Sequence, residues 1–315
     1  MFSEIIALFN KYDRIIIHRH KNPDGDAIGS QVGLKHLILE NLPGKEVYIV
    51  GDDPKRYSFI ENSEPDIIPD GLYEGALAVI LDLSAPELIS DDRYKLAAAT
   101  ARIDHHIFIA PIADSEVIDT SYESCCGLIT ELAIMAGWRV PTVAAMALYT
   151  GTVTDSGRFR YDCVSSDTHR RASFLMKWGV DTNAIYRELY SDDLNAVKLR
   201  ASFTLKINTL PSGIAYIYTT LDEFLATGES SFTISRGMVG TMSDLRGIDI
   251  WANFTETENG VLAELRSSRY NINPIATKYG GGGHAKACGA TLKDKDEAMS
   301  MLSDLEELIK ENKNG

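Results

Sequence analysis

The stretch RIIIHRHKNPDGDAIGS, residues 14–30, decides the fold of the first half of this chain. Its β-branched run, Arg14–His18, predicts a buried strand. Pro23 and Gly25 then turn the chain, and an amphipathic segment at Ala27–Asn41 predicts a helix. A strand that runs through a short turn into a helix is typical of α/β proteins with a parallel sheet.

The same alternation continues to residue 190. Further strands are predicted at Glu46–Val50, Ala76–Leu81 and Ala101–Asp104. Helices are predicted at Ser124–Trp138, at Thr142–Thr154 and, as two helices, within Asp167–Tyr190. We therefore expect residues 1–190 to form an α/β domain whose mostly parallel sheet is covered by helices on both faces.

The pattern changes in the last third of the chain. Residues 191–202 are charged and predict a linker or a connecting helix. Residues 203–315 hold half-buried strand patterns at 213–219, 249–254 and 260–266 and a helix at 296–310. We expect a smaller α+β domain there.

Composition excludes several classes of protein. The chain has 315 residues, of which 44% are hydrophobic and 24% charged, so collagen-like and wholly disordered proteins are excluded. Its net charge of −14 argues against binding long nucleic acid. No apolar run approaches the roughly 20 residues that cross a bilayer, and no secretion signal opens the chain. The four cysteines form no C-x-x-C pair, which favours reduced thiols and a cytoplasmic location.

Acidic and histidine side chains recur where the predicted elements end. His20, Asp24 and Asp26 follow the first strand, Asp82 ends the run ALAVIL, and the triplet 104–106 (DHH) follows another strand. Taken singly, such aspartates are explained as well by turns and helix N-caps as by a ligand-binding site. Carboxyl ends of parallel strands share one edge, however, where open α/β sheets bind ligands.

A fourth segment adds Asp155, which closes a helical pattern before a glycine turn. Two carboxylates about 4 Å apart repel by about 4 kcal/mol at an effective dielectric near 20, so several together need cations. Carboxylate and imidazole without thiolate suit Mn²⁺, with Fe, Co or Mg as competitors. The sequence therefore predicts a metal hydrolase in which two ions activate a water. Arg158 and Arg160 could also line this site.

H-x-x-x-D-x-D, the isolated Asp82, the DHH triplet and Asp155 resemble, in order, the four motifs of the DHH phosphoesterase superfamily. The resemblance implies two divalent ions, held by six residues: His20, Asp24 and Asp82 for one, and Asp26, Asp82, His105 and Asp155 for the other. It also implies that His106 acts on the scissile phosphate as hydrogen-bond donor or general acid, and that Asp104 supports this loop. His18 is interpreted as a structural residue at the end of its strand.

A glycine-rich motif, KYGGGGHAKACGA at 278–290, stands near the end of the chain. Bare backbone N–H groups in such a run could approach an anion, and arginine guanidinium groups upstream suit phosphate. The motif resembles the DHHA1 substrate domain. The residues expected to bind substrate are Arg266, Arg269, Gly281, Gly282, Gly283 and His284.

The two domains in this order resemble the nano-RNase subfamily, which also removes phosphate from 3′-phosphoadenosine 5′-phosphate (pAp). The resemblance implies hydrolysis of short oligonucleotides, linear di-adenylate from cyclic di-AMP turnover, or pAp, and it implies a homodimer. Neither long nucleic acid nor a membrane is an expected partner. Two alternatives stay open: a manganese-dependent inorganic pyrophosphatase, and a nucleotide sensor without catalysis.

Overall fold

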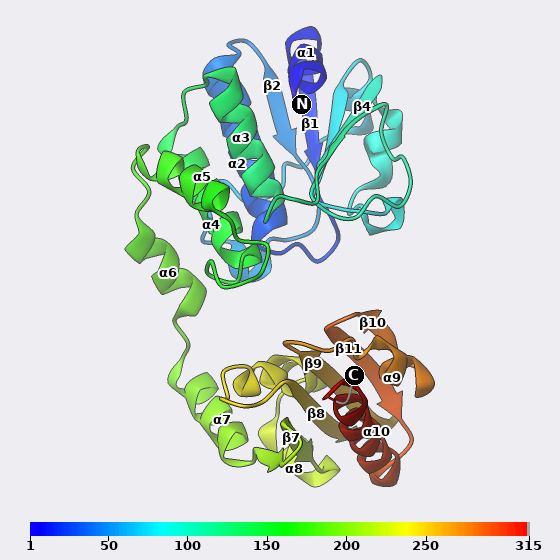
Figure 1. Cartoon of the computed structure of the whole chain (residues 1–315). Coiled ribbons are helices and arrows are strands. Elements are labelled where there is room, and N and C mark those ends of the chain that lie inside the picture. The colour runs from blue at the N-terminus through cyan, green and yellow to red at the C-terminus, as the bar shows by residue number, and fades with distance from the viewer. Residues whose placement is uncertain (314–315) are drawn as a thin grey trace. The chain divides into compact units, whose positions relative to one another are not determined.

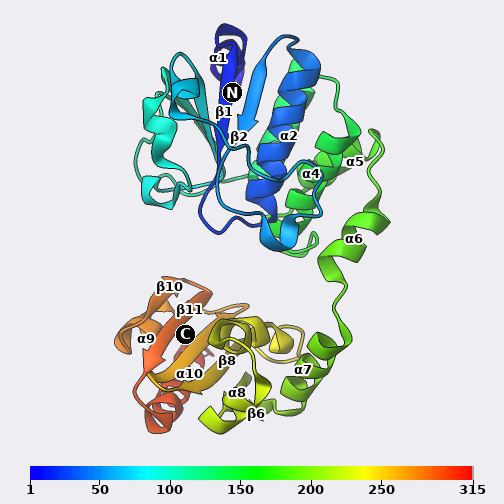
Figure 2. The ribbon, with the colours of Figure 1, turned by 180° about the vertical axis from the view of Figure 1, so that it is seen from behind.

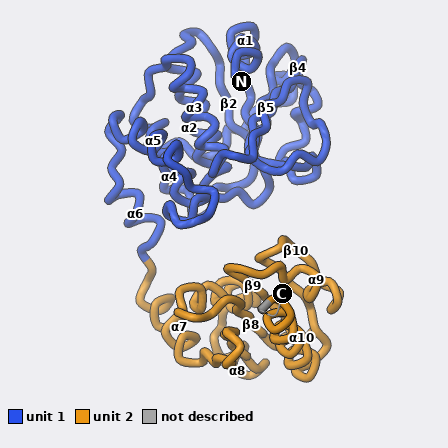
Figure 3. Tube along the Cα trace, viewed as in Figure 1, with its two compact units in different colours: residues 1–191 blue, residues 192–315 orange. Residues whose placement is uncertain are grey.

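The computed structural model describes residues 1–313 (Figure 1). The chain folds into two compact units, one of residues 1–191 and the other from Asp192 onward (Figure 3). Within the described residues, every helix is too short or too polar to cross a membrane.

The first unit is built on a five-stranded sheet in the order β2-β1-β3-β4-β5, and all neighbouring strands are parallel. Its strands are β1 (Arg14–His18), β2 (Glu46–Ile49), β3 (Leu77–Leu81), β4 (Ala99–Asp104) and β5 (Ser115–Ile118). The predicted parallel α/β sheet is therefore confirmed, although β5 was not predicted. Because the chain leaves β1 toward β2 and later returns to β3 on the other side, a topological switch point lies between β1 and β3.

The long helices of this unit pack on one face of the sheet. They are α1 (Ser3–Lys11), α2 (Gly25–Asn41), α3 (Cys125–Ala136), α4 (Thr142–Asp155), α5 (Ser166–Met176) and α6 (Thr182–Tyr190). Alternate strand residues such as Ile15 and Ile17 join them in one large core, whereas Ile16 points to the opposite face. That opposite face is covered by loops with the short helices η2 (Asp70–Tyr73) and η4 (Asp92–Leu96). Helices thus cover both faces, as expected, but on the second face the β2–β3 and β3–β4 connections supply only short 3₁₀ helices.

Helices α2 and α4 lie against each other at very close range (Figure 2). A methyl group at Gly29 of α2 would lie 2.5 Å from the Ala147 carbonyl oxygen of α4. Glycine is therefore needed for this contact. The close approach brings Asp26, in the first turn of α2, near Asp155, which is the last residue of α4.

The second unit contains a six-stranded mixed sheet in the order β10-β11-β9-β8-β7-β6, in which only β7 and β8 are parallel neighbours. The strands are β6 (Asn208–Leu210), β7 (Ile214–Thr219), β8 (Ile250–Thr257), β9 (Gly260–Ser267), β10 (Gly282–His284) and β11 (Ala287–Leu292). The helices are α7 (Leu194–Leu205), α8 (Leu221–Thr227), α9 (Asn273–Lys278) and α10 (Lys295–Lys313). Separate apolar clusters cover the two faces, one with α9 and α10 and the other with α7.

Candidate metal centre

The predicted metal ligands meet at the carboxyl edge of the first sheet. Three groups of acidic and histidine side chains have ligand atoms within 4.8 Å of one another, and the groups share members. They are His20, Asp24 and Asp82; Asp26, His105 and Asp155; and Asp82, His105 and His106. All six residues that the sequence nominated as ligands are therefore brought together around the switch point between β1 and β3.

The first group surrounds the Nε2 atom of His20. This atom lies 3.8 Å from Asp24 Oδ1 and 3.7 Å from Asp82 Oδ2. Asp24 is also the N-cap of α2, because its Oδ1 accepts hydrogen bonds from the backbone N–H groups of Asp26 and Ala27, both at 3.0 Å. The capping interpretation and the ligand interpretation of Asp24 are thus compatible.

The second group surrounds the Nε2 atom of His105. Asp155 Oδ2 lies 3.3 Å away, Asp82 Oδ1 lies 3.4 Å away and Asp26 Oδ2 lies 3.8 Å away. The other ring nitrogen, Nδ1, is 3.3 Å from the Tyr122 carbonyl oxygen, which orients the imidazole toward the carboxylates.

Asp26 is held by the start of α3, a contact that sequence reasoning missed. Its Oδ2 accepts a hydrogen bond from the Cys125 backbone N–H at 2.7 Å, and its Oδ1 accepts one from Cys126 at 2.9 Å. The positive end of the helix dipole therefore faces this carboxylate. Both cysteine side chains are buried, as expected of small apolar residues, and burial raises the pKa of each thiol well above its usual value.

Asp82 joins two of these groups and is almost fully buried. Its side chain is 3% exposed, its Oδ1 has no hydrogen-bond partner among the described residues, and its φ of +59° lies in the left-handed region. Strained backbone of this kind collects at functional sites. An orphaned, buried carboxylate oxygen facing two imidazoles fits a divalent cation, which would supply the missing partner.

The carboxylates and imidazoles of the centre compete for protons. Burial and the charge of Asp82 raise the pKa of Asp26 to about 7, and burial and the charge of Asp26 raise that of Asp155 to about 7. Burial lowers the pKa of His105, but the neighbouring carboxylates outweigh this effect and raise it to about 10. By the same balance the pKa of His20 rises to about 9. Groups with such raised pKa values hold protons in the metal-free site, and metal binding must displace those protons.

His106 is supported by a buried ion pair. Its Nδ1 lies 2.8 Å from Asp104 Oδ1, while Asp104 Oδ2 accepts a hydrogen bond from Arg102 Nη2 at 2.5 Å. The hydrogen bond to Asp104 raises the pKa of His106. Sequence reasoning did not nominate Arg102, although its spacing of two from Asp104 on a strand places both on one face.

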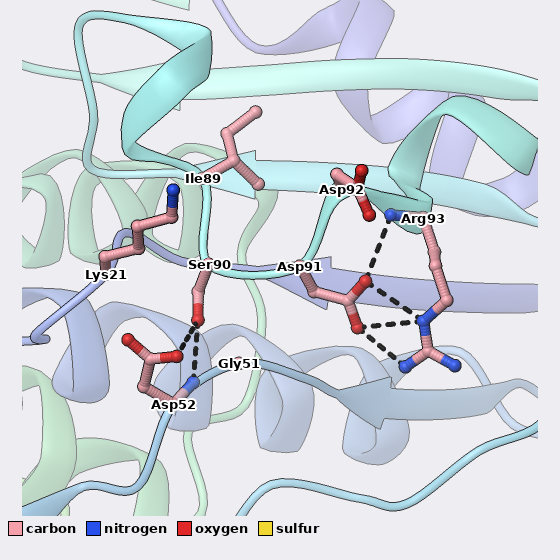
Figure 4. A pocket seen from close by; sticks show the side chains of 8 residues that line it. All are labelled: Lys21, Gly51, Asp52, Ile89, Ser90, Asp91, Asp92 and Arg93. Atoms are coloured by element: carbon pink, nitrogen blue, oxygen red, sulfur yellow. Dashed lines mark hydrogen bonds and ion pairs between the residues drawn. The ribbon is translucent and has the colours of Figure 1, made fainter.

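The loop that carries His20 is fixed by the β3–β4 connection. A pocket of about 400 Å³ opens between these segments, and Figure 4 shows two pairs among its lining residues, Ser90 with Asp52 and Arg93 with Asp91. Ser90 donates to Asp52 at 2.7 Å, and Arg93 binds Asp91 at 2.6 Å. His18 points to the same connection: it is fully buried, with Nδ1 3.1 Å from the Asp91 carbonyl oxygen.

Comparison with known proteins decides the family. The DHH family, N-terminal domain, matches residues 14–152, and the DHHA1 domain matches residues 213–311. Over 315 residues the chain is 35% identical to the bifunctional oligoribonuclease and PAP phosphatase NrnA of Bacillus subtilis (strain 168), covering 99% of this chain and 100% of that protein. This chain belongs to the DHH/DHHA1 phosphoesterase family. The resemblance of its motifs to this family is confirmed.

Other proteins are also similar along nearly their whole length. A probable bifunctional oligoribonuclease and PAP phosphatase NrnA of Streptococcus mutans is 34% identical, with 98% of this chain and 99% of that protein covered. An exopolyphosphatase-related protein from Bacteroides fragilis has the same fold, with a TM-score of 0.85 at 23% identity over 97% of this chain and 95% of the other. DHH phosphoesterases depend on divalent metals, so the prediction of a metal-dependent hydrolase is confirmed.

The second unit brings two nominated substrate residues into one row of its sheet. Arg266 of β9 pairs with Ala287 of β11, which in turn pairs with His284 of β10, so the two side chains flank Ala287 on one face. Arg266 Nη1 lies 3.1 Å from Glu264 Oε2. Arg269 lies beyond the end of β9 and is exposed.

Part of the glycine run forms a strand. Gly282, Gly283 and His284 form the edge strand β10. Gly283 has a φ of +134°, and a side chain there would lie 2.5 Å from the Ala287 carbonyl oxygen. Close strand pairing therefore requires this glycine. Beside it, a pocket of about 390 Å³ is lined by Gly281, Gly289, Glu264 and neighbouring residues. Anion binding at this strand stays a prediction.

Proposed function

We propose that this chain hydrolyses short phosphorylated nucleotides, releasing mononucleotides from short RNA and linear di-adenylate and phosphate from pAp. The observation that carries the proposal is the set of overlapping groups that share Asp82 and His105. The names of the relatives support the choice of substrates, since two full-length relatives are named for oligoribonuclease and PAP phosphatase activity.

The proposed cofactors are two Mn²⁺ ions. The first would be held by His20, Asp24 and Asp82, and the second by Asp26, Asp82, His105 and Asp155. When bound, such ions lower the pKa of water and stabilise the charge that develops on a phosphoryl group. Hard oxygen and imidazole ligands without thiolate support manganese.

One bond-breaking step accounts for both activities. Water adds to the phosphorus attached at the 3′ oxygen, and the bond between that phosphorus and O3′ breaks. With pAp the products are AMP and phosphate, and with 5′-phosphorylated di-adenylate they are two molecules of AMP. His106 Nδ1 is engaged by Asp104, so its Nε2 is the nitrogen left to donate a proton or hydrogen bond to the reacting group.

We further propose that residues 1–190 form the catalytic domain, that residues 191–202 connect the domains, and that residues 203–315 form the substrate domain. Its proposed substrate-binding residues are Arg266, Arg269, Gly281, Gly282, Gly283 and His284. The row that contains Arg266 and His284 supports this role, because it offers a guanidinium and an imidazole to one phosphate. The net charge of −14 supports short substrates over long nucleic acid.

A cytoplasmic homodimer is the proposed form in the cell. The four cysteines are unpaired, and three of them are buried, which supports a reducing compartment. The homodimer is carried over from the DHH/DHHA1 family and is tested by the mass of the protein in solution.

Product identification by chromatography tests the function. The protein with Mn²⁺ is given 5′-phosphorylated di-adenylate and pAp in parallel reactions. We expect AMP from both, abolished by a chelator and by Asp155→Ala. Metal-loaded protein that releases no AMP from either substrate would overturn the proposal and favour a pyrophosphatase or a nucleotide sensor.

A further inference from the structure

Two arginines and two tyrosines form a cluster at the rim of the metal centre, here called the rim cluster. Arg56 and Tyr57 come from the short helix η1 (Lys55–Tyr57), Arg158 from the turn after α4, and Tyr190 from the end of α6. The Arg158 guanidinium carbon lies 4.7 Å from the centre of the Tyr190 ring, and that of Arg56 lies 5.3 Å from the Tyr57 ring.

The rim cluster borders the proposed metal ligands. Arg158 follows the proposed ligand Asp155 by three residues in the chain. Burial and the charges of Asp24 and Asp155 raise the pKa of Tyr57. Arg56 Nη2 donates to the Leu189 carbonyl oxygen at 3.2 Å, which joins η1 to the end of α6. All these elements belong to the first unit.

The turn that carries Arg158 is held in an unusual conformation. Gly157, Arg158 and Phe159 have φ values of +57°, +64° and +60°, although two of them have side chains. The backbone N–H of Arg158 donates to the Val153 carbonyl oxygen at 2.8 Å, and that of Phe159 donates to Ser156 Oγ at 3.0 Å. Left-handed residues with side chains persist where the surroundings fix them and gather at ligand sites.

The two guanidinium groups keep their positive charge available. Both arginines are exposed, and within residues 1–313 neither Arg56 nor Arg158 forms an ion pair with a carboxylate. Elsewhere in the unit, exposed Arg170 and Arg139 are neutralised by Glu131 and Glu40. Flat guanidinium and phenol groups beside a phosphate-cleaving centre match the stacking surfaces that bind unpaired nucleobases.

We propose that the rim cluster binds the 3′-terminal nucleoside of di-adenylate, which keeps the reacting phosphorus on its O5′ when the bond to O3′ breaks. This inference rests on the proposed function, in which residues of the second unit bind a phosphate of the substrate. Linear di-adenylate has a nucleoside beyond its reacting phosphorus, whereas pAp ends at that phosphate. The rim cluster therefore favours di-adenylate over pAp without changing the bond that breaks.

The test compares the two substrates in one variant. In Arg158→Met, we expect the ratio of kcat/KM for di-adenylate to that for pAp to fall by about tenfold or more, because a stacking surface for one base is lost. Tyr190→Ala should lower the same ratio, and Tyr190→Phe should restore it. Arg139→Met is the matched control, since it removes an exposed arginine charge beyond the far end of α3 and should keep the wild-type ratio.

The outcomes separate this inference from the proposed function. A wild-type protein that hydrolyses neither substrate contradicts the proposed function itself. A wild-type protein that hydrolyses both, with an Arg158→Met ratio equal to its own, overturns only the rim-cluster proposal. An equal loss of kcat/KM on both substrates in Arg158→Met and Tyr190→Ala, with unchanged thermal midpoints, also overturns it. The cluster would then act on the hydrolysis step that the two substrates have in common.

Discussion

Arg102 and Asp104 form an ion pair inside the first unit, with Nη2 and Oδ2 2.5 Å apart and both side chains fully buried. The other oxygen of Asp104, Oδ1, lies 2.8 Å from Nδ1 of His106. Buried charge is costly unless it is paired, so the arginine allows a carboxylate to stay ionised beneath the imidazole. Burial alone would raise the pKa of Asp104, but its bonds to His106 and Arg102 keep that pKa below its usual value.

Arg102→Met leaves the Asp104 carboxylate buried without its cation. We expect the free energy of unfolding to fall by about 3–5 kcal/mol in urea titrations, and turnover to fall by about 10–100-fold as His106 loses its fixed orientation. Adding Asp104→Leu should recover stability but not turnover. Wild-type turnover in the double variant would contradict a positioning role for the pair.

Asp82→Asn tests the residue shared by both proposed ions. Asparagine tolerates the left-handed backbone at this position, so the fold should be retained. We expect turnover to fall by more than the roughly 100-fold typical of supporting residues, with loss of bound metal measured by elemental analysis. Asp114→Asn is the control, because this carboxylate binds Thr100 near the start of β4, away from the carboxyl edge. Full metal content with near-normal turnover in Asp82→Asn would contradict the assignment.

Metal affinity should rise with pH. In the metal-free protein the pKa values of Asp26 and Asp155 are raised to about 7, and those of His20 and His105 to about 9 and 10. These groups hold protons at pH 6 that metal binding must displace. Calorimetric titration with Mn²⁺ in buffers of different ionisation enthalpy should show proton release and tighter binding at pH 8 than at pH 6. Binding that is independent of pH would contradict these pKa shifts.

The same shifts determine the stability of the metal-free protein. A carboxyl with a raised pKa stabilises the fold at low pH, and this contribution is lost as pH rises from about 4 to about 7. Each raised histidine contributes below pH 6.5, and its contribution is lost as pH rises through about 9 to 10. The thermal midpoint of chelated protein relative to metal-loaded protein should therefore fall between pH 6 and pH 8, as measured by scanning calorimetry.

Arg266→Met tests the substrate row in the second unit. Loss of a charged hydrogen bond, about 1.5–3 kcal/mol, should raise KM for pAp by about 10–100-fold. The effect on kcat should be smaller, because Arg266 is not one of the proposed metal ligands. Arg200→Met on α7 removes an exposed arginine paired with Asp192 and serves as the control. A normal KM in Arg266→Met would place substrate binding elsewhere.

Local sequence patterns predicted most elements because their signals lie within a few residues. The run RIIIH is β1 with the predicted bounds, and the segment at Thr142–Thr154 is α4 to within one residue. Strand β5 (Ser115–Ile118) was missed, since it is a short edge strand whose pairing with β4 supplies its stability. The sequence pattern did not predict that the helices on the second face would be short 3₁₀ helices, because the cover that a connection provides depends on tertiary packing.

The sequence by itself determined which chemistry the first unit holds. Aspartates and histidines at the ends of strands and helices identified the candidate ligands, because parallel strands deliver their carboxyl ends to one edge. Only the tertiary structure decided how those ligands are supported. The contact of the α3 N-terminus with Asp26 and the rim cluster join segments that are distant in the chain, and no local pattern encodes such contacts. Arg102 and Asp104 share one face of β4 by their spacing, but only the packing of the sheet buries the pair.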